Sequence, residues 1–215
     1  MPEKKSRQTG SIKNIVFDLG GVLLEWNEEK ILHKVFPRDK EVRDIVRRTV
    51  FEHPDWKELD RGTLELEEAI PRFCRRNGRT GQEMAALMKE VREILSPLPE
   101  SVSLLRNLHN MQIPLYCISN MHKHAWERIR GWDLFRNFRG MAISCLIHKI
   151  KPKPEIYRHL LESYSLKPEE TLFIDDMPSN ILGAEKAGMK GILFTSANEC
   201  AENLSAVIQT EIHLK

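Results

Sequence analysis

The chain has 215 residues, of which 41% are hydrophobic and 30% are charged. This length suits one domain with a large insertion, or two small domains, and the composition is that of a globular protein with enough apolar material for a core. The 33 lysine and arginine residues nearly balance the 31 aspartate and glutamate residues. This balance argues against a nucleic-acid-binding or membrane-binding protein.

The cysteines and the first residues indicate a cytoplasmic protein. Four cysteines lie far apart and form no Cys-x-x-Cys pair, and Cys117 and Cys145 sit inside apolar runs, as expected of reduced core residues. Residues 1–11 are polar and basic with no apolar stretch, so we expect a flexible tail and no secretion signal. No apolar run approaches the ~20 residues that span a bilayer.

Short apolar runs alternate with helical patterns along most of the chain. We expect parallel strands at 12–17, 115–118, 141–145, 171–174 and 191–194. Helices are expected at 99–109 and 154–164, each starting at a proline, and at 179–188, starting at the capping residue Ser179 and ending at Gly188. This alternation predicts an α/β fold: a Rossmann-like parallel sheet with helices on both faces.

The stretch 27–96 breaks the alternation. It carries no strand signal and shows amphipathic helical patterns, for example around Phe73 and around Leu87. We expect a helical insertion placed directly after the first strand, above the sheet edge where ligands bind in such folds. The expected organisation is therefore a tail (1–11), an α/β core (12–26 and 97–215) and this insertion (27–96).

Polar residues follow the predicted strands in a definite order. These residues are Asp18 after the first strand, Ser119 and Asn120 after the second, Lys151 after the third, and Asp175 and Asp176 after the fourth. Alone, each has an ordinary structural explanation: a turn, a helix cap or a surface lysine. In a parallel sheet, however, these strand ends converge at one edge, and all four in order make a purely structural explanation improbable.

The clustered charges indicate phosphoryl transfer. Three carboxylates repel one another and one lysine cannot neutralise them, so we expect a divalent cation. An all-oxygen site favours Mg²⁺. A metal beside a free carboxylate can transfer a phosphoryl group covalently through Asp18, with Lys151 offsetting charge and Ser119 donating to a phosphoryl oxygen.

This order of motifs resembles the haloacid dehalogenase (HAD) superfamily over residues 12–195. The stretches that carry the resemblance are "FDLGGVLLEWN", "HPDWKELDRG", "ISN", "KPKPEIYRHLL" and "FIDDMPSNILGAEKAGMKGILF". They are similar to a phosphatase branch that includes a bacterial glucose-1-phosphatase and the phosphatase half of soluble epoxide hydrolase. In that branch the insertion is a small helical cap, and "LDRG" at 59–62 matches one of its segments.

The resemblance implies a role for each matching residue. Asp18 would be the nucleophile, and Ser119, Asn120 and Lys151 would contact the phosphoryl group. The metal ligands would be Asp18, the carbonyl of Gly20, Asp175 and Asp176, with Asn180 in a supporting role. The implied protein is a Mg²⁺-dependent phosphatase for a small phosphorylated metabolite.

Two departures from the family pattern stand out. Gly20 replaces the usual general acid–base aspartate two residues after the nucleophile, and His148-Lys149 stands where a glycine and an apolar residue are common. A missing general acid predicts a preference for good leaving groups, such as those of sugar 1-phosphates, acyl phosphates or aryl phosphates. Either His122 or His124 is a candidate for activating water, although exposed loop histidines are more common than catalytic ones.

Three other functions compete with the phosphatase. A catalytically weak relative that binds a phosphorylated ligand or a protein is supported by Gly20 and opposed by Asp18, Lys151 and Asp176. A haloacid dehalogenase also uses an aspartate nucleophile but needs no metal, so the Asp175-Asp176 pair favours phosphate chemistry. A response-regulator receiver carries its acidic pair at the first strand, the reverse of the order here.

Overall fold

A computed structural model describes residues 11–208 and 212 of the chain. Its centre is a sheet of five parallel strands in the order β3-β2-β1-β4-β5. The strands are β1 Asn14–Phe17, β2 Leu115–Ser119, β3 Gly140–Ile143, β4 Thr171–Asp175 and β5 Lys190–Leu193. Phe17, at the end of the central strand β1, is paired with Cys117 of β2 and Ile174 of β4. The residues that follow β1, β2 and β4 therefore emerge side by side at one edge of the sheet.

All five predicted strands are present, but the third ends earlier than predicted. Strand β3 pairs with β2 only as far as Ile143, opposite Ser119, where β2 itself ends. The chain then turns directly into the short helix α8 (Ser144–Ile147), so Cys145 lies in a helix. The prediction of a strand over 141–145 is wrong at this end because a continuous apolar run does not distinguish a strand from a buried helical turn.

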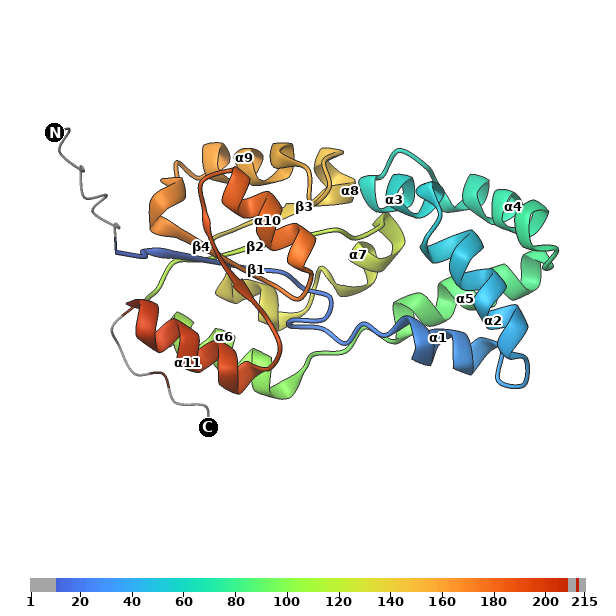
Figure 1. Ribbon diagram of the computed structural model, residues 1–215, viewed down its shortest axis with the longest axis horizontal. Helices are drawn as coiled ribbons and strands as arrows, with labels where there is room; N and C mark the ends of the chain where they lie inside the picture. Colours follow the sequence, from blue (N-terminus) through green and yellow to red (C-terminus); the bar gives the residue numbers. More distant parts are fainter. Residues whose placement is uncertain (1–10, 209–211, 213–215) are drawn as a thin grey trace, which may run out of the picture.

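Helices cover both faces of the sheet, as predicted (Figure 1). They are α6 Pro99–Asn110, α7 Lys123–Ile129, α9 Pro154–Ser163, α10 Pro178–Lys186 and α11 Ala197–Ile208, with 3-10 turns at η2 Asp133–Asn137 and η3 Pro168–Glu170. Ile15 and Phe17 of β1 belong to the apolar core that includes residues of α6 and α11, whereas Val16 belongs to the core formed with α9 and α10. This alternation is what a strand buried on both faces requires.

The start of α10 differs from the prediction. The helix begins at Pro178, Met177 occupies the capping position, and no side chain caps it, so Ser179 lies inside the first turn. Proline at the first position has a helical φ and no N–H to satisfy, which favours a start there. The helix ends at Lys186, and Gly188 follows with a φ of +88°.

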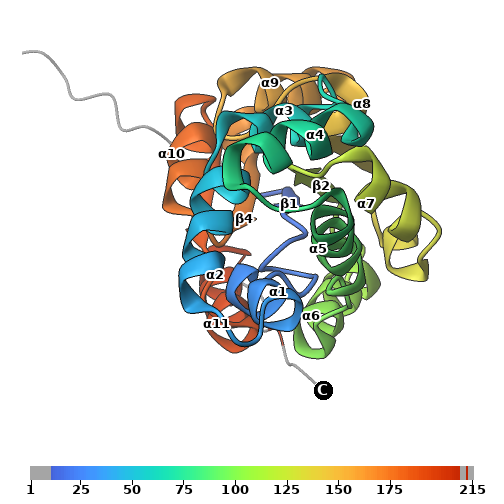
Figure 2. The same cartoon turned by 90° about the vertical axis from the view of Figure 1, so that its right-hand side faces the viewer.

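From residue 28 to residue 93 the chain forms helices and the loops that connect them, with no strand. The helices are α1 Glu28–Val35, α2 Lys40–Val46, the π-helical turn η1 Arg47–Phe51, α3 Pro54–Arg61, α4 Leu66–Asn77 and α5 Gly81–Glu93. These helices enclose a separate apolar cluster in which Phe73, Met84 and Leu87 are fully buried. Figure 2, which looks onto this end of the molecule, shows them in front of β1, β2 and β4.

The helical insertion is joined to the sheet through two adjacent segments. The Glu25 N–H donates to the Ser96 carbonyl at 2.8 Å, and the Leu98 N–H donates to the Leu23 carbonyl at 2.9 Å. The insertion therefore stands above the sheet edge on a paired stem of backbone.

The remaining sequence expectations concern the cysteines, the membrane and the tail. All four cysteines are free, and Cys117, Cys145 and Cys200 are buried. No helix in the described part of the chain is long and apolar enough to cross a membrane. Of the predicted tail over 1–11, residues 1–10 lie outside the described residues.

Candidate active site

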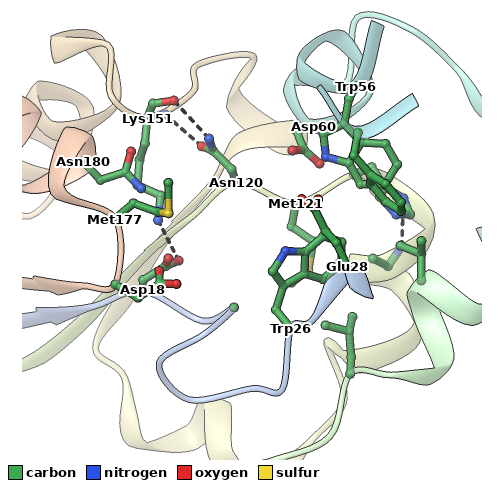
Figure 3. Close-up of a pocket in the computed structure, with 17 residues that line it drawn as sticks. Asp18, Trp26, Glu28, Trp56, Asp60, Asn120, Met121, Lys151, Met177 and Asn180 are labelled. Atoms are coloured by element: carbon green, nitrogen blue, oxygen red, sulfur yellow. Dashed lines mark hydrogen bonds and ion pairs between the residues drawn. The ribbon is translucent and has the colours of Figure 1, made fainter. Parts of the chain in front are cut away.

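A cavity of about 270 Å³ lies between the carboxyl edge of the sheet and the helical insertion. Its sheet side is lined by polar groups, among them Asp18, Asn120, Lys151 and Asp176. Its other side is lined from the insertion and the stem by aromatic rings and two carboxyl groups, which are Trp26, Phe51, Trp56, Glu28 and Asp60. Figure 3 shows Asp18, Asn120 and Lys151 on one side of the cavity and Trp26, Glu28, Trp56 and Asp60 on the other.

Asp18 and Lys151 form the centre of the sheet side. Asp18 follows β1 directly, and its Oδ1 lies 2.7 Å from the Lys151 Nζ. The same Oδ1 accepts the Leu19 N–H at 2.7 Å. Both side chains are nearly inaccessible, at 6% exposed for Asp18 and 4% for Lys151. One carboxylate oxygen of Asp18 is therefore fixed by two donors, whereas no donor from the described residues contacts the other.

Asp175 anchors the lysine from the other side. Its Oδ2 accepts from the Lys151 Nζ at 2.7 Å, and the Asn180 amide donates to both carboxylate oxygens at 2.9 and 3.1 Å. Its Oδ1 also accepts the Met177 N–H at 2.8 Å. Asp175 is fully buried and its oxygens are already engaged, so its main observed role is to hold Lys151 in place.

Asp18, Asp175 and Asp176 form a group that could hold a metal ion. One carboxylate oxygen from each lies within 4.8 Å of the others. Gly21 has a φ of +75°, and a Cβ built on it would collide with the Asp176 carboxylate, so the backbone passes this carboxylate closely only because residue 21 is glycine. Oxygen donors of this kind fit Mg²⁺. Because Asp175 is occupied by protein donors, Asp176 is the more available carboxylate of the pair.

The charges of this group do not balance. Burial raises the pKa of Asp18 to about 8, with Lys151 opposing the rise and Asp175 adding to it. Burial and the neighbouring Asp175 also raise the pKa of Asp176. Burial acts to lower the pKa of Lys151, but Asp18 and Asp175 outweigh it and raise that pKa, so the ammonium stays charged. Three carboxylates around one ammonium leave negative charge that a divalent cation would offset.

Ser119 and Asn120 follow β2 but differ in their contacts. The Asn120 side chain accepts the Lys151 N–H at 2.8 Å and donates to the Lys151 carbonyl at 3.0 Å. It thereby positions the loop that carries the lysine, a role that the sequence did not indicate. Ser119 ends β2 with 1% of its surface exposed, and neither Ser119 nor Asp175 is among the residues that line the cavity.

Of the two histidines considered for water activation, His122 alone lines the cavity. Its Nδ1 accepts the Ala125 N–H at 3.3 Å, which places the ring hydrogen on Nε2 and leaves no free basic nitrogen. Burial lowers its pKa to about 3, so the ring is neutral. His124 instead faces Glu67 of α4, with 3.9 Å between Nε2 and Oε1.

His148, the second departure from the family pattern, occupies a left-handed turn. It ends α8 with a φ of +55°, a conformation in which glycine is favoured. Its Nδ1 lies 3.0 Å from the carbonyl of Arg61 in the insertion. The side chain therefore joins the two parts of the molecule instead of entering the cavity.

The residues that the insertion contributes were not identified in the sequence. The Trp56 ring lies against three other rings, with centroid distances of 4.7 Å to Phe51, 6.2 Å to Trp26 and 6.0 Å to His122. Trp56 and Asp60 lie in "HPDWKELDRG" and Trp26 lies in "FDLGGVLLEWN", two of the stretches that carry the family resemblance, but none of the three could be assigned a role from the sequence. Helical patterns show which face of a helix is apolar, but they do not show which residues will overhang a neighbouring sheet.

Comparison with known proteins identifies the family. A model described as haloacid dehalogenase-like hydrolase matches residues 12–188. The sesquiterpene phosphatase astK of Aspergillus oryzae is 28% identical over 191 residues, covering 87% of this chain and 92% of that protein. The D-ribitol-5-phosphate phosphatase of Bacteroides thetaiotaomicron is 22% identical over 214 residues, covering 93% of this chain and 100% of that protein.

A solved structure agrees with these matches. A HAD-like family hydrolase from Porphyromonas gingivalis, itself described as predicted, has a TM-score of 0.72 and 26% identity, covering 94% of this chain and 100% of its own. The resemblance noted in the sequence is thus confirmed at the level of the family. With a family model that extends from the first strand to the end of the fourth strand–helix unit, this chain belongs to the haloacid dehalogenase-like hydrolases.

Proposed function

We propose that the protein is a Mg²⁺-dependent phosphatase that hydrolyses a small phosphorylated metabolite through an aspartyl-phosphate on Asp18. The observation that carries the proposal is the array of Asp18, Lys151 and Asp175 beside Asp176 at the sheet side of the cavity. Phosphatases among the relatives support the same reaction class.

The hydrogen bonds of Asp18 suggest how it attacks. Leu19 and Lys151 both engage Oδ1, which leaves Oδ2 as the nucleophilic oxygen. Lys151 lies between Asp18 and Asp175, where its charge would offset that of the phosphoryl oxygens. Ser119 stays a predicted donor to one of those oxygens. The Asn120 side chain holds the backbone of Lys151 in place, and the Asn180 amide holds the carboxylate of Asp175.

The metal would be held by Asp18, Asp176 and the Gly20 carbonyl, with Asp175 beside them. When bound, Mg²⁺ would neutralise charge and let an anionic nucleophile approach an anionic phosphate. Asp18, Asp176 and Gly20 all line the cavity, which is consistent with this assignment.

We propose that residues 27–96 act as a cap that selects the organic part of the substrate, above a core of 12–26 and 97–215. The Trp26, Phe51 and Trp56 rings offer an apolar wall opposite the phosphoryl site. Such a wall suits an isoprenoid chain or the C–H face of a sugar ring, and sugar 1-phosphates remain candidate substrates. A cytoplasmic location stays a prediction.

The competing function is a weak enzyme that mainly binds a phosphorylated ligand or a protein, and Gly20 is the feature that favours it. The test is phosphate release from p-nitrophenyl phosphate, acetyl phosphate, sugar 1- and 6-phosphates and an isoprenoid monophosphate, with Mg²⁺ or with chelator. Asp18→Asn serves as the blank. We expect Mg²⁺-dependent release that disappears in the blank. Release no greater than the blank on every substrate would contradict the proposal and favour the binding protein.

A further inference from the structure

Asp60 is a cavity-lining carboxyl group without a role in the reaction described so far. It lies near the end of α3, and its pocket-facing side chain points toward Asn120 and the side of the cavity that holds Asp18 (Figure 3). In phosphoryl transfer the attacking and leaving oxygens are roughly in line with phosphorus between them. A group that protonates the leaving oxygen must therefore approach from the side opposite Asp18, which is the side of Asp60.

In the family pattern the general acid stands at the position that Gly20 occupies in this protein, and glycine has no side chain. Gly20, two residues after Asp18, lines the cavity, and a Cβ built there would meet the Trp26 Cβ at 3.6 Å, an ordinary contact. The backbone thus has room for a side chain at this position, but the sequence supplies none.

Other polar groups that line the cavity are already committed. Lys151 is bound to Asp18 and Asp175, and the Asn120 amide is bound to the Lys151 backbone. His122 is a neutral ring with its Nδ1 occupied. Asp176 also lines the cavity, but it is assigned to the metal in the proposed function. Two further carboxyl groups line the cavity, Glu28 and Asp60.

The surroundings of Glu28 and of Asp60 distinguish the two carboxyl groups. The Asp60 carboxyl points toward Asn120 and the sheet side (Figure 3), and after burial the charge of Lys151 is the next influence on its pKa. Glu28 instead senses Arg47 and Glu52 of the insertion. Of these two carboxyl groups, Asp60 is therefore the better candidate to face the phosphoryl site.

The backbone around Asp60 is fixed to the core at three successive residues. The Asp60 carbonyl accepts from the Ser144 hydroxyl, and the Arg61 carbonyl lies 3.0 Å from the His148 Nδ1. Gly62 has a φ of +74°, and a Cβ there would lie 2.6 Å from the Cys145 carbonyl oxygen. Ser144 also accepts the Met121 N–H at 2.8 Å, which ties this contact to the end of β2. These contacts give a residue of the insertion a defined position relative to Asp18.

We propose that Asp60 is the general acid–base of this enzyme, supplied by the insertion in place of a side chain at residue 20. The inference rests on the proposed phosphatase function. In the first step the Asp18 oxygen bonds to phosphorus, the bond from phosphorus to the leaving oxygen breaks, and the Asp60 carboxyl gives its proton to that oxygen. In the second step the Asp60 carboxylate takes a proton from water, the water oxygen bonds to phosphorus, and the bond from phosphorus to the Asp18 oxygen breaks. This step frees inorganic phosphate and restores the Asp18 carboxylate and the Asp60 carboxyl.

The protonation of Asp60 suits both steps. Burial raises its pKa to about 7, while Lys151 and the backbone N–H of His122 act in the opposite direction. The nearby thiol of Cys145 is neutral because its pKa is raised to about 11. A group with a pKa near neutrality is able both to give and to take a proton.

The test compares leaving groups in Asp60→Asn. We expect hydrolysis of glucose 6-phosphate, which has a poor leaving group, to fall by ~10²–10⁴-fold, whereas p-nitrophenyl phosphate loses less than about tenfold. The matched control is Glu28→Gln, a second carboxyl group of the same cavity, which should change both rates by the same factor. An equal loss on both substrates in Asp60→Asn would overturn the proposal.

Two measurements keep the proposal testable if Asp60→Asn folds poorly. The wild-type rate should depend only weakly on the pKa of the leaving group, and a steep dependence would mean that no general acid acts. Gly20→Asp should raise the glucose 6-phosphate rate of Asp60→Asn far more than that of the wild type, and an equal gain in both would exclude Asp60. Absence of any phosphate release by the wild type would instead contradict the proposed function itself.

Discussion

The two sides of the cavity are built differently. On the sheet side, Asp18, Lys151, Asp175 and Asn180 are joined by contacts of 2.7 to 3.1 Å, so each charged group is held by at least one other. On the insertion side, aromatic rings lie against one another, and the Asp60 carboxyl points toward the sheet side (Figure 3). In the mechanism proposed above, the chemistry common to all phosphate esters is assigned to the sheet side, whereas substrate recognition and proton transfer are assigned to the insertion side.

The largest effect on stability is expected from Lys151→Met. This change leaves Asp18 and Asp175 buried without their common cation, and breaking such a pair typically destabilises a protein by about 3–5 kcal/mol. Denaturant unfolding at pH 7 would measure the free energy. Lys153→Met, at an exposed lysine two residues away, is the control and should stay within about 0.5 kcal/mol. Equal losses in both variants would contradict a central role for Lys151 in holding the site.

Binding of Mg²⁺ should stabilise the sheet side next most strongly. At a Mg²⁺ concentration one hundred times the dissociation constant, the folded state gains about 2.7 kcal/mol, which thermal unfolding detects as a rise in Tm that chelator removes. In Asp176→Asn the rise should be largely lost, because Asp176 is the carboxylate least occupied by protein donors. An unchanged rise in this variant would place the metal elsewhere.

Substitutions at Gly62 and Gly78 test the contact between the insertion and the α/β core. Gly62 and Gly78 both have a left-handed φ, but a Cβ at Gly62 would meet the Cys145 backbone, whereas one at Gly78 meets nothing within 4 Å. Gly78→Ala should therefore destabilise by about 1–2 kcal/mol from backbone strain alone. Gly62→Ala should lose about 1–3 kcal/mol more because of the collision. Similar losses by denaturant unfolding would show that residues 60–62 are not fixed against α8.

The smallest effect concerns the pH dependence of stability. The pKa of Asp60 is raised from 3.8 to about 7 in the folded protein, so the folded state keeps a proton that the unfolded state has lost between these values. The free energy of unfolding should therefore decrease as pH rises from about 4 to about 7. Asp60→Asn removes this decrease and should be more stable than the wild type at pH 8 by about 2 kcal/mol, allowing for solvent screening at the cavity. The two proteins should unfold alike at pH 4, and an equal difference at both pH values would contradict the raised pKa.

The difference between the two sides of the cavity also explains which features could be predicted from the sequence. Asp18, Lys151, Asp175 and Asp176 were found because a parallel sheet brings its strand ends to one edge whatever the details of packing. The pairing of Asn120 with the Lys151 backbone was not found, since it depends on the path of a loop. The early end of β3 was not predicted. It depends on where the partner strand β2 ends, and the apolar run that contains Cys145 carries no information about that end.

The insertion side was predictable only as a set of helices. Its apolar periodicity located residues such as Phe73 and Leu87 in a core, and both are buried. The position of that core relative to the sheet depends on contacts such as the one between Arg61 and His148, which are 87 positions apart in the sequence. Trp56 and Asp60 lie one turn apart on α3, and only the docking of that helix brings them to the cavity.

The central claim is that Asp18 carries the phosphoryl group, and trapping that intermediate tests it most directly. The protein is mixed with Mg²⁺ and p-nitrophenyl phosphate, quenched in acid within the first turnovers, digested and analysed by mass spectrometry. We expect the peptide containing Asp18 to gain the mass of one phosphoryl group, and the corresponding Asp18→Asn peptide to gain none. Phosphate release by the wild type without labelling of this peptide, or with equal labelling in Asp18→Asn, would contradict the account.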